Sequence, residues 1–405
     1  MLGRRNGGRS GLTGAIVAAV ARERQPGAPI PFTLPALEGN EQLYMDEALT
    51  RSRLSGDGPF TKRCQESLER SLGVPKALLT TSCTSALDMT ALLLDVQPGD
   101  EVIVPSFTFV SSVNAYVLRG ATPIFADIRP DTLNIDERKL ESLITPRTKV
   151  IVVVHYAGVA CAMDQIMSVA QRHGVTVVED NAHGLFARYT GRYLGTFGRM
   201  ATLSFHETKN FTCGEGGALL INDPSLIARA EVIREKGTDR TRFFRGQVDK
   251  YTWVDIGSSY LPADLLAAML LGQLEARERI QSLRKRIWNH YFTNLRDWAL
   301  EQDVRLPIVP TEAEQAYHLF YLLLPSLAER QRLIEHLKAR GIQSAFHYQP
   351  LHLSEMGRRH GGHEGECEVT EHVADCLVRL PFYNRLSDED LERVVSAVRE
   401  FRVAS

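Results

Sequence analysis

The sequence predicts an α/β protein in which a mostly parallel sheet lies between helices, followed by a smaller α/β domain. Strand and helix patterns alternate from about residue 60 onward, which is typical of βαβ units. Two of the strand patterns, 149–155 and 175–179, are almost entirely apolar, as expected for strands covered on both faces. A long helical pattern from about residue 265 to residue 300 marks the change to the second domain.

Apolar periodicity, together with the Gly and Pro residues that interrupt it, predicts the elements of the first domain. Residues 60–72 have the pattern of an amphipathic helix that Gly73 ends, and residues 163–173 have the same pattern before Gly174. Between these helices we expect strands at 77–80, 101–105, 123–127 and 149–155, a helix at 85–96, and a helical run that reaches residue 118.

The second domain is predicted from the same signals. The helical pattern over 265–300 is broken or bent along its length, and a strand (317–324), a helix (327–340), a strand (342–348) and two helices follow. Ser387 and Asp390 form a capping-box pattern at the start of the last helix. We therefore divide the chain into a disordered N-terminal extension, a large cofactor-binding domain and a small C-terminal domain, at residues 1–29, 30–270 and 271–405.

Composition and charge exclude several classes of function. The chain has 405 residues, with 47 Lys and Arg against 49 Asp and Glu, so no basic field points to nucleic acid or an anionic membrane. No run of 18 or more apolar residues predicts a transmembrane helix. The six cysteines are scattered without a CxxC pair, which favours free thiols in a reducing cytoplasm over disulfides or a zinc site. We expect a cytoplasmic protein without a resident metal.

Lys209 is the most informative residue of the chain. It lies between two short apolar runs, 201–205 and 218–221, and the Gly-rich turn 214–217 follows it. An amine that is held rigidly and partly desolvated loses its proton more readily and becomes a nucleophile toward carbonyls. The aldehyde of pyridoxal 5′-phosphate (PLP) is the obvious carbonyl, whereas a surface lysine after a strand is the simpler interpretation. Ser204, shortly before Lys209, adds a hydroxyl suited to a phosphate.

Three further sites fit the same ligand. The turn 81–85 (TSCTS) precedes a helix, where hydroxyls and free backbone N–H groups suit a phosphate, although ordinary N-capping also explains them. Asp180 follows a buried strand at the edge where open α/β sheets bind ligands, and a carboxylate there can pair with a protonated pyridine nitrogen. His183 would orient the Asp180 carboxylate or contact the cofactor ring, and Phe109 would stack on the cofactor ring. Taken singly, Asp180 is more commonly explained as a turn-forming residue and Phe109 as a core aromatic.

With these residues the chain resembles the fold-type I, PLP-dependent sugar-nucleotide aminotransferases called the DegT/DnrJ/StrS group. The resemblance runs from about residue 30 to residue 402 and is closest to the dTDP-4-amino-4,6-dideoxygalactose transaminases. It is carried by six segments, of which the long FFRGQVDKYTW is the most specific. These are 204–210 (SFHETKN), 234–238 (REKGT), 243–253 (FFRGQVDKYTW), 255–261 (DIGSSYL), 346–348 (FHY) and 350–352 (PLH).

The resemblance implies a role for each matching residue around the cofactor ring. Lys209 would hold PLP as a Schiff base and move the proton during transfer. Asp180 would pair with the pyridine nitrogen, and His183 would lie where the family has Gln or His near the ring. Phe109 would occupy the stacking position. PLP is thus the expected cofactor.

The resemblance also implies contacts with phosphates. Cys83 and Thr84 would lie at the cofactor's phosphate turn, with Ser204 adding a hydroxyl. The family commonly has Gly where Cys83 stands, and often an Asn from the partner subunit near Ser259, so this chain departs from the pattern at both places. The candidates for binding the nucleotide diphosphate are Arg242, Arg245 and Lys250. A run of charged residues such as this one is more often a solvated surface loop.

The activity implied by the resemblance is ping-pong amino transfer through pyridoxamine phosphate in a homodimer with shared active sites. L-Glutamate would be the donor and dTDP-4-keto-6-deoxyglucose the acceptor, which gives a 4-amino-4,6-dideoxy sugar with galacto configuration for polysaccharide or antigen biosynthesis. The alternatives are amination at C3, a PLP-dependent sugar dehydratase and a PLP-domain regulator. The dehydratases have His in place of Lys209, and a regulator needs a DNA-binding module for which residues 1–29 are too short. A metal site built on His352, His360 and His363 lacks cysteine partners at useful spacing.

Overall fold

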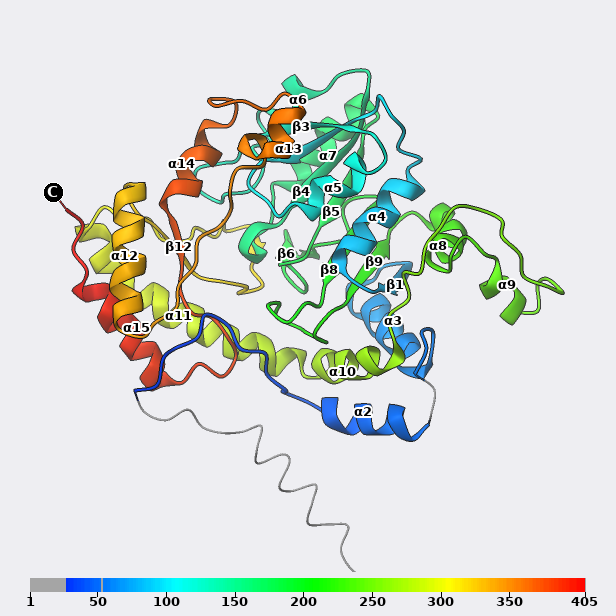
Figure 1. The fold of residues 1–405 in the computed structure, drawn as a ribbon, viewed down its shortest axis with the longest axis horizontal. Coiled ribbons are helices and arrows are strands. Elements are labelled where there is room, and N and C mark those ends of the chain that lie inside the picture. Colours follow the sequence, from blue (N-terminus) through cyan, green and yellow to red (C-terminus); the bar gives the residue numbers. More distant parts are fainter. Residues whose placement is uncertain (1–26, 52–53, 405) are drawn as a thin grey trace, which may run out of the picture.

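A computed structural model describes residues 27–51 and 54–404, so the extension predicted for residues 1–29 lies almost wholly outside the described residues. The centre of the fold is a seven-stranded sheet with helices on both faces (Figure 1). Its strands are β1 (Lys76–Thr80), β2 (Glu101–Pro105), β3 (Thr122–Ala126), β4 (Thr148–Val154), β5 (Thr176–Asp180), β8 (Met200–Ser204) and β9 (Gly217–Ile221). Their order is β1-β9-β8-β5-β4-β2-β3, and β9 alone runs antiparallel to the other six strands. The predicted α/β class with a mostly parallel sheet is confirmed.

The sheet is buried on both faces because its strands are apolar at nearly every position. In β4, Val150 and Val152 pack into the core on one face, while Ile151 and Val153 pack into the core on the other. The first face is covered by α4 (Cys83–Leu93), α5 (Ser111–Val117) and α8 (Ile227–Arg234). The second face is covered by α3 (Pro59–Leu72), α7 (Met163–His173) and α10 (Asp264–Glu275).

The helix ends follow local signals in the sequence. Gly73 and Gly174 end α3 and α7 in the left-handed conformation, with φ of 71° and 66°, as the sequence predicts. Helix α4 begins at Cys83, two residues earlier than predicted, because Ser82 caps it. The Ser82 Oγ accepts a hydrogen bond of 3.0 Å from the backbone N–H of Ser85.

Parallel strands place several loops at one edge of the sheet. Strands β1, β2, β5 and β8 all end at this edge, and antiparallel β9 begins there with Gly217. A Cβ on Gly217 would lie 2.3 Å from the carbonyl carbon of Ser82 and 2.4 Å from the amide nitrogen of Cys83. The absence of a side chain therefore lets β9 start directly against the turn before α4.

The C-terminal part of the chain has its own core. Helices α11 (Arg277–Glu301), α12 (Leu327–Ala339) and α15 (Asp388–Glu400) pack around the two-stranded sheet of β11 (Tyr321–Leu323) and β12 (Leu377–Arg379). The predicted helical pattern over 265–300 is two helices, α10 and α11, that meet at Ala276, and the predicted domain boundary after residue 270 falls within α10. Ile30 is fully buried in the C-terminal core. Ser387 caps α15 through the N–H of Asp390, as its sequence pattern predicts.

The strand predicted at 342–348 is wrong. This segment makes only isolated bridges, from Ile342 to Ile30 and from Ala345 to Arg379. Ala345 meets β12 at its last residue, and residues 347 and 348 then turn into a cavity. The predicted strand 317–324 is shortened to β11, and β12 was not predicted because it directly follows a helix without a turn signal.

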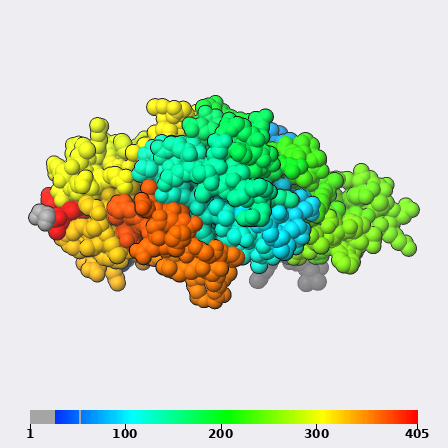
Figure 2. Space-filling view, turned by 90° about the horizontal axis from the view of Figure 1, so that it is seen from above, coloured from blue at the N-terminus to red at the C-terminus, as the bar shows by residue number. Residues whose placement is uncertain are grey.

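The remaining elements are short or peripheral. They are α2 (Glu41–Thr50), α6 (Leu140–Leu143), α9 (Arg240–Phe244), α13 (Glu355–Arg359), α14 (Glu368–Cys376) and a small sheet of β6 (Arg188–Tyr189), β7 (Arg192–Tyr193) and β10 (Ala313–Glu314). The segment around α9 projects from the body at the end opposite the C-terminal core (Figures 1 and 2). Within the described residues, no helix has the length and apolar character needed to cross a membrane.

Candidate active site

A cavity of about 590 Å³ lies at the sheet edge where β1, β2, β5 and β8 end. Its walls come from the loops after these strands and from the C-terminal part of the chain. The structure brings together in this one cavity all of the residues that the sequence predicts around the cofactor. They are Cys83, Thr84, Phe109, Asp180, His183, Ser204 and Lys209.

Hydroxyl groups gather at the N-terminus of α4. The Thr81 hydroxyl lies 2.8 Å from the Ser85 hydroxyl, and the Thr84 hydroxyl lies 2.8 Å from that of Ser111. The Cys83 thiol donates to the Thr202 hydroxyl at 3.4 Å, and burial raises the pKa of this thiol, so it stays neutral. The positive end of the helix dipole together with these hydroxyls suits an anion such as a phosphate.

Asp180 is fixed at the end of β5 by hydrogen bonds to both of its carboxylate oxygens. Oδ2 accepts from the Ser112 hydroxyl at 2.7 Å, and Oδ1 accepts from the backbone N–H of Ala182 at 3.2 Å. The Ser112 hydroxyl in turn lies 2.9 Å from that of Thr108. The residue is only 6% exposed, yet it lines the cavity, so the carboxylate is held in place for a ligand.

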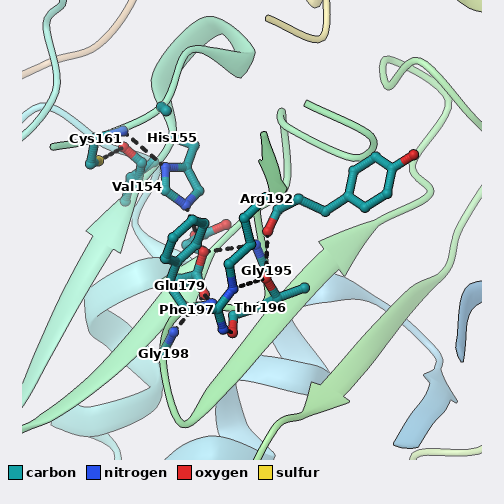
Figure 3. Close-up of polar contacts among 12 residues, drawn as sticks. Val154, His155, Cys161, Glu179, Arg192, Gly195, Thr196, Phe197 and Gly198 are labelled. Carbon is teal, nitrogen blue, oxygen red and sulfur yellow. Dashed lines mark hydrogen bonds and ion pairs between the residues drawn. The ribbon is translucent and has the colours of Figure 1, made fainter. Parts of the chain in front are cut away.

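Glu179, the preceding residue, anchors the strand end from the other side of the sheet. Its fully buried carboxylate accepts hydrogen bonds of 2.7 Å from the backbone N–H groups of Gly195, Phe197 and Gly198 (Figure 3). It also accepts a bond of 3.0 Å from Nε2 of His155. These contacts fix the turn 195–198 that leads into β8, so the two strands that carry Asp180 and Ser204 are tied together.

Lys209 projects into the cavity from the loop between β8 and β9. Its backbone N–H donates to the carbonyl of His206 at 2.9 Å, which holds the loop in a tight turn. The side-chain amine has no hydrogen-bond or ion-pair partner among the described residues. Burial lowers its pKa below the usual 10.5, which increases the fraction of neutral, nucleophilic amine.

Three histidines lie along one side of the cavity. His183 stacks on His318 with ring centroids 4.1 Å apart, and His347 stacks on Tyr348 at 3.9 Å. Burial lowers the pKa of His183, His318 and His347 well below 6.5, so all three are neutral at physiological pH. Nδ1 of His183 is buried without a hydrogen-bond partner, so it is free to meet a ligand.

These groups fit PLP. The hydroxyl-rich turn suits its phosphate, the Asp180 carboxylate suits a protonated ring nitrogen, and the Lys209 amine suits its aldehyde. Phe109 is 58% exposed although it lines a cavity, and an uncovered aromatic ring at such a place suits stacking on a flat ligand.

Comparison with known proteins agrees with this fit. Residues 35–399 match the model of the DegT/DnrJ/EryC1/StrS aminotransferase family. The chain belongs to this family. It is 34% identical over 379 residues to the GDP-perosamine synthase of Caulobacter vibrioides, which covers 92% of this chain and 98% of that protein. It is 33% identical over 381 residues to the spore coat polysaccharide biosynthesis protein SpsC of Bacillus subtilis, covering 92% and 96%.

Solved structures of the family have the same fold. The PLP-form of the Streptococcus pneumoniae protein Spr1654 matches with a TM-score of 0.84 and 28% identity, over 92% of this chain and 98% of that one. This member of the DegT/DnrJ/EryC1/StrS family is therefore a fold-type I, PLP-dependent transaminase. The fold and cofactor that the resemblance implied are confirmed.

The candidate substrate cations lie elsewhere in the chain. Arg242, Arg245 and Lys250 are on or after α9, in the projecting segment, and none of them lines the cavity that contains Lys209. Arg245 pairs with Glu231 at 2.7 Å and lines a separate cavity of about 750 Å³. Within one chain, the structure therefore does not bring these three residues to the family's active site.

His352 has a role within the fold. Its Nδ1 lies 2.6 Å from the Ser106 hydroxyl and its Nε2 lies 3.0 Å from a carboxylate oxygen of Glu371. Ser106 and His352 are fully buried and line none of the four cavities described for residues 27–51 and 54–404, so a substrate in these cavities does not reach this serine–histidine–glutamate arrangement. In the part of the chain that the structure describes, no group of three or more His, Cys, Asp or Glu residues is arranged to hold a metal ion.

Several residues of the cavity could not be predicted from the sequence. His318 and Arg379 belong to the C-terminal part and have no local motif that marks them. His347 and Tyr348 are in the FHY segment of the resemblance, which was the available signal, but no role was assigned to them. Ser112 supports Asp180 from α5, and its position one turn into a helix gave no indication of this contact.

Proposed function

We propose that this transaminase moves the amino group of L-glutamate to C4 of dTDP-4-keto-6-deoxyglucose. The product would be the 4-amino-4,6-dideoxy sugar with galacto configuration. The proposal rests on one observation: Lys209, Asp180 and the hydroxyl-rich turn before α4 line the same cavity. A nucleotide sugar as acceptor is supported by the likeness to a GDP-perosamine synthase, and the dTDP-linked acceptor is supported by the segment 243–253.

Bound PLP supplies an aldehyde for amines and a cationic ring that accepts electrons. The chain's own residues perform the rest. Neutral Lys209 would be the amine that holds the aldehyde at rest. Its Nζ would then take the proton from the α-carbon of glutamate and later deliver a proton to C4 of the sugar. General acid–base catalysis of this kind contributes about 10²–10⁴-fold. Asp180 holds the proton on the ring nitrogen, which an amide in its place could not do.

The histidines of the cavity add no positive charge beside the ring. Burial keeps His183, His318 and His347 uncharged at physiological pH, so they would not repel the cationic ring that Asp180 pairs with. His183 can orient a ring substituent through the unpaired Nδ1. Phe109, which is exposed in the cavity, would stack on one face of the ring.

We further propose that the protein acts as a homodimer in which each active site is shared. The segment 243–253 is the most specific part of the resemblance, yet it projects from the body of the molecule (Figures 1 and 2), and none of its residues lines the cavity of its own chain. Large apolar side chains on and near it are exposed, with Phe244 at 71% and Trp253 at 77%. Such a patch indicates a protein interface. A partner subunit would bring Arg242, Arg245 and Lys250 toward the diphosphate of the acceptor.

The test is to incubate the holoenzyme with L-glutamate and dTDP-4-keto-6-deoxyglucose and to determine the product by NMR. We expect a product with an axial amino group at C4, as in the galacto amino sugar, together with one equivalent of 2-oxoglutarate. Lys209→Ala is the control and should give no product. No amination, or an equatorial amino group at C4, would refute the proposal.

A GDP-linked 4-keto-6-deoxyhexose is the second candidate acceptor, because the chain is 34% identical to a GDP-perosamine synthase. The same assay with GDP-4-keto-6-deoxymannose separates the two. A higher kcat/KM for the GDP sugar than for the dTDP sugar would show that the GDP sugar is the preferred acceptor.

A further inference from the structure

A cavity of about 730 Å³, which we call the hairpin cavity, is lined by the β6–β7 hairpin and by the start of α11. Its walls come from residues 186–193, 277–285 and 309–317. Among the described residues, it shares none of its lining with the cavity that contains Lys209. A cavity of this size accommodates a ligand as large as a nucleotide.

Two arginines of the hairpin cavity are held on neighbouring aromatic rings. The guanidinium of Arg188 lies 4.1 Å from the centre of the Tyr193 ring, and that of Arg277 lies 5.4 Å from the centre of the Phe186 ring. The centres of these two rings are 6.3 Å apart. The rings therefore restrict both guanidinium groups and bring them to the same end of the cavity.

Both guanidinium groups keep donors for a ligand. Nη2 of Arg188 donates to the Tyr193 hydroxyl at 2.7 Å, and Nε of Arg277 donates to Glu278 at 3.1 Å. Nε of Arg188 and Nη2 of Arg277 have no hydrogen-bond partner in residues 27–51 and 54–404. Because the arginine fork matches phosphate oxygens, this end of the cavity suits a phosphate group.

The charges of the lining also favour an anion. Lys285 adds a third cation, and its amine has no hydrogen-bond or ion-pair partner among the described residues. The acidic residues of the lining are Glu278, which is 89% exposed, and Glu314, which is also exposed. Three cations therefore face two carboxylates that water already solvates.

Further along α11, the hairpin cavity suits a flat ring. The Tyr317 ring contacts the Trp288 ring, with centroids 6.2 Å apart, about three helical turns after Arg277. Between these ends, Oε1 of Gln281 is buried without a hydrogen-bond partner among the described residues. An aromatic ring stacks on a nucleobase, and an amide oxygen accepts a hydrogen bond from an N–H of the base.

Two aromatic residues of the wall have a strained backbone. Phe186 has a φ of 68° and Tyr317 a φ of 52°, in the left-handed region that residues with bulky side chains rarely adopt. The carbonyl of Tyr317 accepts a hydrogen bond of 2.9 Å from Nε of the buried Arg284, which holds this conformation. Strain of this kind is concentrated at ligand-binding and switch segments, so it supports a binding role for this wall.

We propose that the hairpin cavity is a second ligand site, separate from the active site, for a nucleoside diphosphate that is free or part of a nucleotide sugar. Arg188 and Arg277 would bind the phosphates. The base would stack on Tyr317 and donate a hydrogen bond to Gln281. Because Tyr317 directly precedes His318, which lines the cofactor cavity, the ligand would contact a segment that also forms the active site.

The test is calorimetric titration of the holoenzyme with dTDP, dTDP-glucose and inorganic pyrophosphate. Arg277→Gln loses a charged hydrogen bond and should weaken binding of all three in the hairpin cavity by about 10–150-fold. Tyr317→Asn, whose new side chain tolerates the left-handed conformation, should weaken dTDP binding by about 5–150-fold and leave pyrophosphate binding unchanged. The tighter of dTDP and dTDP-glucose identifies the form of the ligand.

Arg296→Gln is the matched control. Arg296 is exposed on the same helix and lines none of the cavities described for residues 27–51 and 54–404. Its replacement removes the same charge and should leave the binding of every probe unchanged. Thermal unfolding shows whether each variant is folded, and Arg188→Gln should repeat the result of Arg277→Gln.

Binding of dTDP that is the same in wild type, Arg277→Gln and Tyr317→Asn would overturn the inference. Equal affinities of the wild type for pyrophosphate and dTDP would also overturn it, because the cavity would then take an inorganic anion only. The proposed function can fail separately. If the active site does not accept a dTDP sugar, the wild type binds one dTDP per chain instead of two, and Arg277→Gln weakens that one.

Discussion

Glu179→Gln tests whether the buried carboxylate behind Asp180 holds the active-site edge together. In the native chain, Oε1 of Glu179 accepts from the N–H groups of Phe197 and Gly198, and Oε2 accepts from Gly195 and His155. Glutamine keeps one acceptor oxygen and places an NH₂ group where the second oxygen was. The N–H of Gly195 then faces another donor.

The expected loss follows from this count of donors. His155 could accept a bond from the new NH₂ only as its other tautomer, and Nδ1 would then no longer accept from the backbone N–H of Cys161, a bond of 3.2 Å. At least one buried N–H is left without a partner, which costs about 1–3 kcal/mol. The bonds that remain lose their charge assistance, which is worth about 1 kcal/mol or more in total. We expect Glu179→Gln to lower the free energy of unfolding by about 3 kcal/mol.

Urea denaturation of the apo-protein, followed by circular dichroism at one protein concentration, measures this loss as a shift of the midpoint. Glu278→Gln is the control, because its side chain is 89% exposed and pairs only with neighbouring Arg277, so no resolvable shift is expected. PLP should also bind more weakly to Glu179→Gln, since the turn 195–198 leads into β8. A loss below about 1 kcal/mol with unchanged PLP affinity would refute the reasoning.

Three further results are expected. Asp180→Asn should keep PLP but slow both half-reactions by about 10²–10⁴-fold. Ser112→Ala removes only the 2.7 Å hydrogen bond to Asp180 and should slow them by about tenfold. Equal rates for wild type and Asp180→Asn in single-turnover absorbance measurements would show that the carboxylate is only structural. Gly217→Ala should displace the turn at Ser82 and raise the dissociation constant of PLP in a fluorescence titration, and an unchanged constant would contradict the close approach of β9. Capture of PLP by the apo-protein should rise with pH, because only the neutral amine attacks an aldehyde, and should level off below pH 10.5 because burial lowers the pKa of Lys209. Nα-acetyl-lysine, whose ε-amine has its ordinary pKa, should level off at a higher pH, and coincident profiles would show that the Lys209 amine is not perturbed.

The loops after the strands could be predicted from the sequence because their positions follow from local patterns. Asp180 and the turn 81–85 each follow a buried strand, and parallel strands place their carboxyl ends at the same edge. Lys209 could be recognised between two apolar runs for the same reason. A general rule of sheet topology therefore predicts that these residues meet at one edge of the sheet.

The C-terminal side of the cavity could not be predicted in this way. Arg379 ends a three-residue strand that directly follows α14, and its place in the cavity depends on how the two parts of the chain pack together. The segment 342–348 alternates like a strand, but it pairs with β12 only at Ala345 and then brings His347 into the cavity. Periodicity describes one element at a time, whereas these positions are determined by contacts between residues far apart in the sequence.

Borohydride reduction of the holoenzyme, followed by digestion and mass spectrometry, tests most directly whether one amine of this chain captures the cofactor. A single phosphopyridoxyl group on the peptide that contains Lys209, and none on Lys209→Ala, is the expected result. A modified lysine elsewhere, or a folded, PLP-supplemented protein without any modified lysine, would contradict the assignment of the active site.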